Sequence, residues 1–335
     1  MAKRIGVLTS GGDAPGMNAA IRTVVRAAIH YNMEPWAVYR GYHGLIQGEV
    51  EPLNSRSVSG IIQRGGTILK SARSDHFRTK EGQKKAAATL EENGIDSLIV
   101  IGGDGSFKGA LALQELGIKI IGIPATIDND IACTDYSIGF DTAVNTVMEA
   151  VNKIRDTASS HERVYVVEVM GRDSGYIALF SGLAGGADVI LIPEVPYDMA
   201  KVCEQIQAAN QKGKTYNIVM VAEGVGQPQS PTGEFLVDES PSLAIARYIQ
   251  QHTGYETRIT ILGHIQRGGA PTVRDRLLAS RLAYHAIELI YQGKSGKMVG
   301  EVDQIVRSWD LSFALAQDKQ LNLDYYHLSN ILSSI

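Results

Sequence analysis

The chain has 335 residues, of which 44% are hydrophobic, so it is long enough for two domains that each bury a core. Its formal net charge is −4, which argues against a general affinity for nucleic acid or for an anionic membrane surface. The chain opens on a strand pattern rather than a signal peptide, no apolar run approaches a membrane span, and the two cysteines form no disulfide framework. We therefore expect a soluble, cytoplasmic protein.

Short apolar runs alternate with helical patterns along the chain. Strands are predicted at Arg4–Thr9, Ser97–Ile101, Ile118–Ile123, Val164–Met170, Val189–Ile192, Ile218–Ala222 and Arg258–Leu262. Helices are predicted at Met17–His30, Lys80–Asn93, Thr142–Thr157, Met199–Gln211, Ser242–Thr253 and Arg274–Gln292. Most of the strand runs lack polar alternation, which is typical of strands buried on both faces. This order predicts α/β layers with mainly parallel sheets, interrupted by a surface excursion at Gly224–Pro241.

Unusual polar residues follow the predicted strands. Ligands of open parallel sheets bind beyond the carboxyl ends of the strands. The segments at those ends are Gly11–Asp13, Gly102–Ser106, Thr126–Asp130, Gly171–Asp173, Glu223 and His264. We expect the functional site along this edge.

Two glycine-rich turns each lead from a strand to a helix. Both Thr9–Asn18 and Gly102–Ser106 let backbone N–H groups approach a phosphate at a helix N-terminus. The first is neither a dinucleotide fingerprint nor a Walker loop, and a tight structural turn explains it equally well. In the second, Asp104 could hold Mg²⁺ against phosphate oxygens or cap the helix. Its three glycines exceed what a cap requires, which favours the metal site.

Two carboxylates flank Asn129 directly after a predicted buried strand. Asp128 or Asp130 could act as general base toward a substrate hydroxyl, with the Thr126 hydroxyl beside them. The alternative is an Asx-turn cluster, which does not account for the position beside the glycine turn. Together the two segments predict phosphoryl transfer to a hydroxyl.

A dispersed cationic set lies near other strand ends. It consists of Arg163, Arg172, Arg258, Arg267 and His264. Guanidinium groups bind phosphate bidentately. Taken singly, each arginine is better explained by a surface ion pair and His264 by a structural role, but the shared position near strand ends favours anion binding for the set.

Six segments, in this order, resemble the bacterial ATP-dependent 6-phosphofructokinases. They are Gly11–Ala19, Gly102–Ser106, Pro124–Asp130, Gly139–Ala143, Met170–Arg172 and Gly263–Gly269. The resemblance implies the phosphofructokinase fold, an α/β fold of two Rossmann-like three-layer α/β/α domains with mainly parallel sheets. An ATP-binding domain would comprise residues 1–139 plus about 266–319, and a fructose-6-phosphate-binding domain residues 140–265 plus about 320–335.

The resemblance also implies an activity and an assembly. A homotetramer would transfer a phosphoryl group from Mg²⁺-ATP to the 1-hydroxyl of fructose 6-phosphate, giving fructose 1,6-bisphosphate and ADP, the committed step of glycolysis. Nucleotide contacts would come from Gly12, Tyr42, Arg73, Ser74, Gly103, Gly105 and Ser106, with Asp104 at the Mg²⁺ position. Asp128 would be the catalytic base, with Thr126 and Asp130 beside it and Arg172 next to the transferring group.

The remaining roles concern the sugar phosphate and a regulatory site. Sugar-phosphate contacts would come from Thr126, Ile127, Asp128, Met170, Gly171, Arg172, Glu223, His264 and Arg267, and from Arg163 and Arg258 of a neighbouring subunit. An effector site for ADP or phosphoenolpyruvate would use Arg22, Arg26, Arg155, Asp188, Lys212 and Lys214. In that site Ser55 stands where an arginine is expected, with Arg56 adjacent, and Asp188 where a glutamate is usual.

Three rival readings stay open. A pyrophosphate-dependent relative carries an acidic residue at the position of Gly105 and Lys at the position of Ala125, whereas both residues here are small and neutral. ATP-using members usually have Gly at the position of Ala125. The lipid and NAD kinases share a glycine–aspartate loop but lack the Pro124–Asp130 and Gly263–Gly269 segments. A catalytically silent nucleotide sensor has no need of Asp128.

Overall fold

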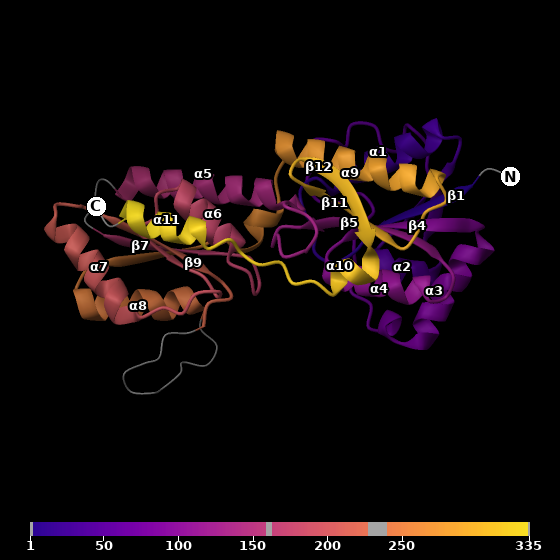
Figure 1. Ribbon diagram of the computed structural model, residues 1–335. Coiled ribbons are helices and arrows are strands. Elements are labelled where there is room, and N and C mark those ends of the chain that lie inside the picture. The colour runs from indigo at the N-terminus through magenta and orange to yellow at the C-terminus, as the bar shows by residue number, and fades with distance from the viewer. Residues whose placement is uncertain (1–2, 159–162, 227–239, 334–335) are drawn as a thin grey trace. The chain divides into compact units, whose positions relative to one another are not determined.

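The chain folds into two compact units (Figure 1), seen in a computed structural model that describes residues 3–158, 163–226 and 240–333. The first unit comprises Met1–Thr142 and Arg267–Lys319, and the second comprises Ala143–Gln266 and Gln320–Ile335. The first segment of the second unit is thus inserted into the first unit, and its second segment follows the first unit in sequence. The middle of the predicted Gly224–Pro241 excursion, residues 227–239, lies outside the described residues.

A mainly parallel sheet forms the centre of the first unit. Its strands are β1 (Arg4–Thr9), β2 (Glu34–Val38), β3 (Val50–Pro52), β4 (Ile95–Gly102), β5 (Lys119–Thr126), β6 (Ile138–Gly139), β11 (Lys297–Val302) and β12 (Ile305–Asp310). They are ordered β12-β11-β5-β4-β1-β2-β3, with β6 paired to the end of β5. Only the outermost strands, β3 and β12, are antiparallel to their neighbours within the described part. The residues of β1, β4 and β5 are almost all buried, as strands covered on both faces require.

Helices cover both faces of this sheet. They are α1 (Met17–His30), α2 (Gly41–Gln47), η1 (His76–Arg78), α3 (Lys80–Glu92), α4 (Asp104–Gln114), α9 (Val273–Tyr291) and α10 (Leu311–Leu315). Helices α1 and α9 pack together, whereas α3 and α4 contact one another and β4. A core of buried apolar side chains, including Phe107, Leu98 and Leu45, lies between β4 and the helices α2, α3 and α4.

The second unit has a smaller, all-parallel sheet. Its described strands are β7 (Val164–Val169), β8 (Val189–Leu191), β9 (Asn217–Ala222) and β10 (Thr257–Ile261), in the order β10-β7-β9-β8. Its helices are α6 (Tyr176–Ala184), α7 (Met199–Gln211), α8 (Pro241–Thr253), η2 (Gly263–Arg267, which ends in the first unit) and α11 (Asp324–Ser333). Helices α6 and α11 pack together beside β8, and α7 packs on α8. Helix α5 (Phe140–Ala158) begins in the first unit and continues in the second.

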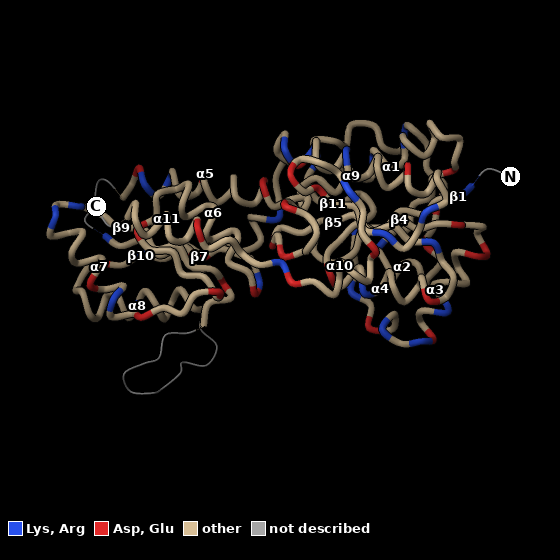
Figure 2. Tube along the Cα trace, in the orientation of Figure 1, with Lys and Arg blue, Asp and Glu red and all other residues tan. Residues whose placement is uncertain are grey.

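Charged residues of both signs are mixed along both units (Figure 2). In the part of the chain that the structure describes, no helix is long and apolar enough to cross a membrane.

Candidate active site

Three loops meet at one edge of the first unit because their strands are neighbours. Strands β5, β4 and β1 lie side by side and parallel, so their carboxyl ends share an edge. The loops that follow contain Gly11–Asp13, Gly103–Ser106 and Ile127–Asp130. The edge predicted from sequence therefore exists within this unit.

The first loop lies against a guanidinium group. Gly11 has a φ of +86°, a conformation that favours glycine. A Cβ atom on Gly12 would lie 2.5 Å from Nη1 of Arg267, and this Nη1 donates to the Asp13 carbonyl at 3.3 Å. Arg267 thus places positive charge beside the loop, where an anion would be stabilised.

The second loop is the start of α4 rather than a free turn. Gly103 precedes the helix, and Asp104 begins it. A Cβ atom on Gly102 would lie 2.5 Å from the Ser10 carbonyl oxygen, so only glycine allows the first two loops to approach this closely. Ser106 is buried, and its carbonyl accepts from the Tyr42 hydroxyl at 2.5 Å.

Tyr42 holds the Gly103–Ser106 loop through its hydrogen bond to Ser106. Its side chain is 6% exposed and stacks on Phe77 at a centroid distance of 4.1 Å. Burial raises the pKa of its hydroxyl, so Tyr42 stays neutral and acts as a hydrogen-bond donor. Two other predicted nucleotide contacts precede Phe77: Arg73 is exposed, and the Ser74 hydroxyl accepts from the Phe77 amide at 3.3 Å.

Asp104 and Gly105 face outward at the helix N-terminus. Both are exposed, and a Cβ atom on Gly105 would have no heavy atom within 4 Å. The described residues contain no cluster of three or more His, Cys, Asp or Glu side chains fit for a metal. One exposed carboxylate suits Mg²⁺, which binds proteins through few carboxylates and keeps water and substrate phosphate as its other ligands, and the adjacent helix N–H groups suit that phosphate. Asp104 thus fits a magnesium ion that arrives with a nucleotide.

The third loop carries the candidate base at the end of β5. Asp128 is 6% exposed, and its backbone N–H donates to the Thr126 hydroxyl at 3.2 Å. The Ile127 side chain is fully buried, which anchors the loop. Asn129 has a φ of +53°, a conformation that Asn tolerates better than most residues. Asp130, which follows, is half-buried.

The second unit forms a separate turn after β7. Gly171 has a φ of +148°, and a Cβ atom there would lie 2.4 Å from the Ser174 carbonyl oxygen. The Glu223 carboxylate accepts from the N–H groups of Gly171 at 3.2 Å and of Arg172 at 2.7 Å. Arg172 itself has a φ of +54° and an exposed side chain. Glu223 therefore fixes the turn that presents the Arg172 side chain to solvent.

A buried glutamine joins this turn to the next predicted segment. Gln266 is fully buried, accepts from the Met170 N–H at 3.3 Å and donates to the Gly263 carbonyl at 3.1 Å. His264 lies in η2, between Gly263 and Gln266 in sequence, and is exposed. The carboxyl ends of β7, β9 and β10 thus bring together Met170–Arg172, Glu223 and His264.

The cationic set lies near strand ends, as predicted, but not all at the same edge of the sheet. Arg163 precedes β7 and Arg258 lies at the start of β10, whereas Arg172 and His264 follow the other ends of these strands. Six residues of β7 separate the two edges, a distance of about 20 Å. Arg163 and Arg258 instead share the carboxylate of Glu256; the Arg163 Nε lies 2.6 Å from it.

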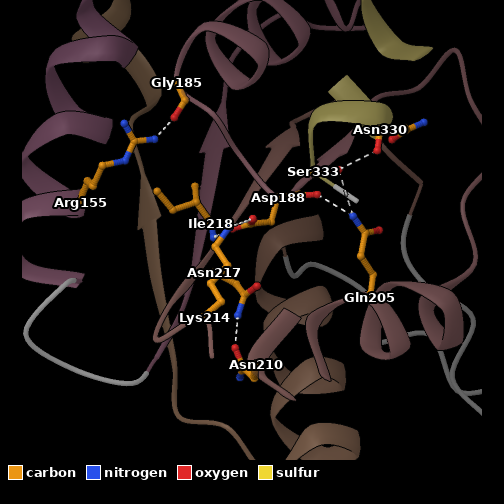
Figure 3. A network of polar contacts seen from close by, with 10 residues as sticks. All are labelled: Arg155, Gly185, Asp188, Gln205, Asn210, Lys214, Asn217, Ile218, Asn330 and Ser333. Atoms are coloured by element: carbon orange, nitrogen blue, oxygen red, sulfur yellow. Dashed lines mark hydrogen bonds and ion pairs between the residues drawn. The ribbon is translucent and has the colours of Figure 1, made fainter. Parts of the chain in front are cut away.

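The predicted effector residues fall in both units, and three residues of the second unit, Arg155, Asp188 and Lys214, make the polar contacts drawn in Figure 3. Asp188 is buried; its carboxylate accepts from the Ile218 N–H at 2.8 Å and pairs with Lys214. Arg155 donates to the Gly185 carbonyl. In the same unit, Lys212 follows the last residue of α7. In the first unit, Arg22 and Arg26 lie on α1; Arg22 is half-buried and Arg26 is exposed.

The sequence analysis assigned no supporting role to several residues that hold the loops. Gln266, Asn129 and Asp275 are buried polar residues that hold the loops described above or the start of α5. Asp275 accepts from the N–H groups of Gly139 and Thr142. Gln266 was visible in the Gly263–Gly269 segment, but its partner Met170 is distant in sequence, so no local pattern indicated the contact.

Comparison with known proteins adds to this geometry. Residues 4–290 match the family model described as phosphofructokinase. The chain is 54% identical over 332 residues to an ATP-dependent 6-phosphofructokinase of Halothermothrix orenii, with 99% of each chain covered.

Solved structures give the same picture. A phosphofructokinase of Saccharomyces cerevisiae is similar at 34% identity and a TM-score of 0.84; the match covers 99% of this chain and 48% of the yeast chain. This chain therefore spans about half the length of that relative. A pyrophosphate-dependent phosphofructokinase of Marinobacter aquaeolei is similar at 25% identity and a TM-score of 0.83, with 96% of this chain and 86% of that chain covered.

Proposed function

Since this chain belongs to the phosphofructokinase family, we propose that it transfers the γ-phosphoryl group of ATP to the 1-hydroxyl of fructose 6-phosphate. The products are ADP and fructose 1,6-bisphosphate, in glycolysis and in the cytoplasm. The observation that carries the proposal is the shared edge of β1, β4 and β5, where two glycine-rich loops lie beside the buried carboxylate of Asp128.

The first unit would bind the nucleotide. Its loop backbones at Gly11–Asp13 and Gly103–Ser106 offer N–H groups, and Arg267 adds positive charge. Asp104 would hold Mg²⁺, which neutralises charge on the phosphates when it is bound. The smaller unit, with Met170–Arg172, Glu223 and His264, would bind the sugar phosphate.

Asp128 is the proposed general base. Its carboxylate accepts the proton of the sugar 1-hydroxyl while that oxygen bonds to the γ-phosphorus and the bond from phosphorus to the bridging oxygen of ADP breaks. The N–H bond to Thr126 fixes the backbone from which the carboxylate projects. Arg172 would stabilise the charge of the transferring group.

The donor is assigned to ATP rather than pyrophosphate by two positions. Gly105 is exposed with open space at its Cβ position, which leaves room for the nucleotide beyond the phosphates. Ala125 is 1% exposed within β5, and a Lys there would bring its ammonium group to this edge. Because this chain has neither an acidic residue at position 105 nor a Lys at position 125, the sequence favours ATP, the larger donor, over pyrophosphate.

The proposed assembly is a homotetramer. The separation of Arg163 and Arg258 from Arg172 along β7 and β10 supports their use by a neighbouring subunit, where they would contact the 6-phosphate. Glu256 keeps their guanidinium groups together until an anion competes for them.

The effector site would bind ADP or phosphoenolpyruvate but would control activity only weakly. Asp188 is buried and already accepts from Lys214 and the Ile218 N–H, so it has little capacity left for an effector's cation. Arg22, Arg26, Arg155 and Lys212 would supply the positive charge that attracts an anion. We expect the half-saturating fructose 6-phosphate concentration to shift less than about tenfold with either effector, in line with a modest coupling energy.

Steady-state assays test the proposed reaction. The purified protein is given fructose 6-phosphate with Mg²⁺ and either ATP or pyrophosphate, and fructose 1,6-bisphosphate is measured directly. The proposal expects product with ATP and a rate at least about a hundredfold lower with pyrophosphate. Binding of ATP without product formation would instead identify a nucleotide sensor.

A further inference from the structure

The loop that carries Asp128 leaves β5 and returns to it. It runs from Ile127 to Ser137 and ends at β6, whose two residues pair with Ala125 and Thr126. The loop is long for a segment that must fix one carboxylate, so its position depends on contacts outside β5.

Asn129 closes the loop internally. Its Oδ1 accepts from the Ser137 N–H at 2.8 Å, and its Nδ2 donates to the Asp135 carbonyl at 3.1 Å. Because Asn129 is 1% exposed and adjacent to Asp128, the Asp135 carbonyl lies one hydrogen bond from the residue next to the proposed base.

The far side of the loop is fixed to the hairpin of β11 and β12. The Asp135 N–H donates to the Glu301 carbonyl at 2.7 Å, and the Asp135 carboxylate accepts from the Asp303 N–H at 2.8 Å. A Cβ atom on Gly300 would lie 2.3 Å from the Cys133 carbonyl oxygen. The hairpin therefore serves as a platform for the loop.

Lys319 adds a contact from the C-terminal part of the chain. Its Nζ donates to the same Asp135 carbonyl at 3.0 Å. Loss of water around the ammonium group lowers the pKa of Lys319 from 10.5 to about 8. The negative charges of Asp135 and Asp130 attract the ammonium group and raise its pKa, but by less. Lys319 is partly buried, and an ammonium group that loses part of its water is stabilised by charged and hydrogen-bonding partners, which the loop supplies here.

Lys319 also stands where the chain leaves the first unit. It is the last residue of that unit, and Gln320 is the first of the next segment of the second. The Gln320 carbonyl accepts from the Tyr176 hydroxyl at 2.9 Å, at the start of α6. This helix follows the turn that contains Arg172. Of these two consecutive residues, Lys319 is thus hydrogen-bonded to the loop of Asp128, and Gln320 is hydrogen-bonded to the helix that follows Arg172.

We propose that Lys319 is a positioning residue that holds the Asp128 loop in its reactive place. The inference rests on the proposed role of Asp128 as base. Lys319 acts through the Asp135 carbonyl and the charge of Asp130 and does not touch the substrates. Its loss should therefore lower the rate of the chemical step and leave substrate binding nearly unchanged.

The test compares Lys319→Met with Lys319→Arg, which keeps the charge and the donor. We expect kcat of Lys319→Met to fall about ten- to hundredfold, the range for misplacing a catalytic group by about an ångström. KM for ATP and for fructose 6-phosphate should stay within about threefold, and Lys319→Arg should regain at least about a third of the parent kcat. Lys84→Met, an exposed lysine of α3, is the matched control.

Two results would overturn the inference. One is a kcat of Lys319→Met within about twofold of the parent; the other is a loss that Lys319→Arg does not restore. If Lys319→Met does not fold, Lys319→Gln is measured under the same limits. An inactive parent protein would contradict the proposed function instead, and so would an Asp128→Asn variant with full activity.

Discussion

Replacing Asp128 by Asn removes the proposed base with little change in shape. The side chain is 6% exposed, and the Thr126 hydroxyl accepts from the backbone N–H of residue 128, which Asn retains. The loop should therefore keep its position. General-base assistance contributes about 10²–10⁴ in rate, which corresponds to about 3–5 kcal/mol of barrier. We expect kcat to fall within this range.

Rapid-quench measurement of fructose 1,6-bisphosphate in a single turnover isolates the chemical step. Equilibrium binding of ATP and of fructose 6-phosphate should remain within about threefold of the parent. Asp96→Asn serves as the control, because Asp96 is an exposed carboxylate near the other end of β4. A single-turnover rate for Asp128→Asn within about threefold of the parent would refute the assignment of the base.

Three further predictions concern the phosphoryl donor, the assembly and the pH dependence of stability. Gly105→Asp should fold normally, because its Cβ position is open. It should raise KM for ATP at least about tenfold and leave KM for fructose 6-phosphate unchanged. Equal losses for both substrates would contradict the donor assignment. Mixed oligomers of Asp128→Asn and Arg163→Ala chains should regain activity that neither has alone, unless Arg163 acts within its own chain. Burial raises the pKa of Asp275 from 3.8 to about 6, so the folded state binds this proton more tightly than the unfolded chain. The free energy of unfolding should fall by about 3 kcal/mol as pH rises through that window, and denaturation of Asp275→Asn should lack this fall.

Elements with strong local signals were predictable from the sequence. The bounds predicted for β1, α1 and α7 agree with the structure, at Arg4–Thr9, Met17–His30 and Met199–Gln211. In each case an unbroken apolar run or a clear helical period coincides with the tertiary packing. Strand β5 extends through Pro124 to Thr126, beyond the predicted end at Ile123, because β4 and β6 pair with its last residues.

Elements with weak local signals were missed. The hairpin of β11 and β12 turns at Asp303 and Gln304, with φ values of +52° and +64°. Such a turn is usually marked by Asn-Gly or Asp-Gly, and Asp-Gln carries no comparable signal. Strand β2 contains Pro35, which argues against a strand in a sequence pattern. Both elements form because neighbouring strands pair with them.

The site divides in the same way. The glycine-rich loops and Asp128 were visible because their residue types are unusual after strands. Lys319 was invisible, since its partner Asp135 lies 184 residues away in sequence. The opposite placement of Arg163 and Arg172 was predictable, because the strand predicted at Val164–Met170 lies between them in sequence.

The most direct test of the account is the choice of phosphoryl donor. Parent protein and Gly105→Asp are each assayed for fructose 1,6-bisphosphate formation with Mg²⁺, fructose 6-phosphate and either ATP or pyrophosphate. The account predicts that the parent uses ATP at least about a hundredfold faster than pyrophosphate and that Gly105→Asp loses most of this preference through weaker use of ATP. Parent activity with pyrophosphate that equals or exceeds activity with ATP would contradict it.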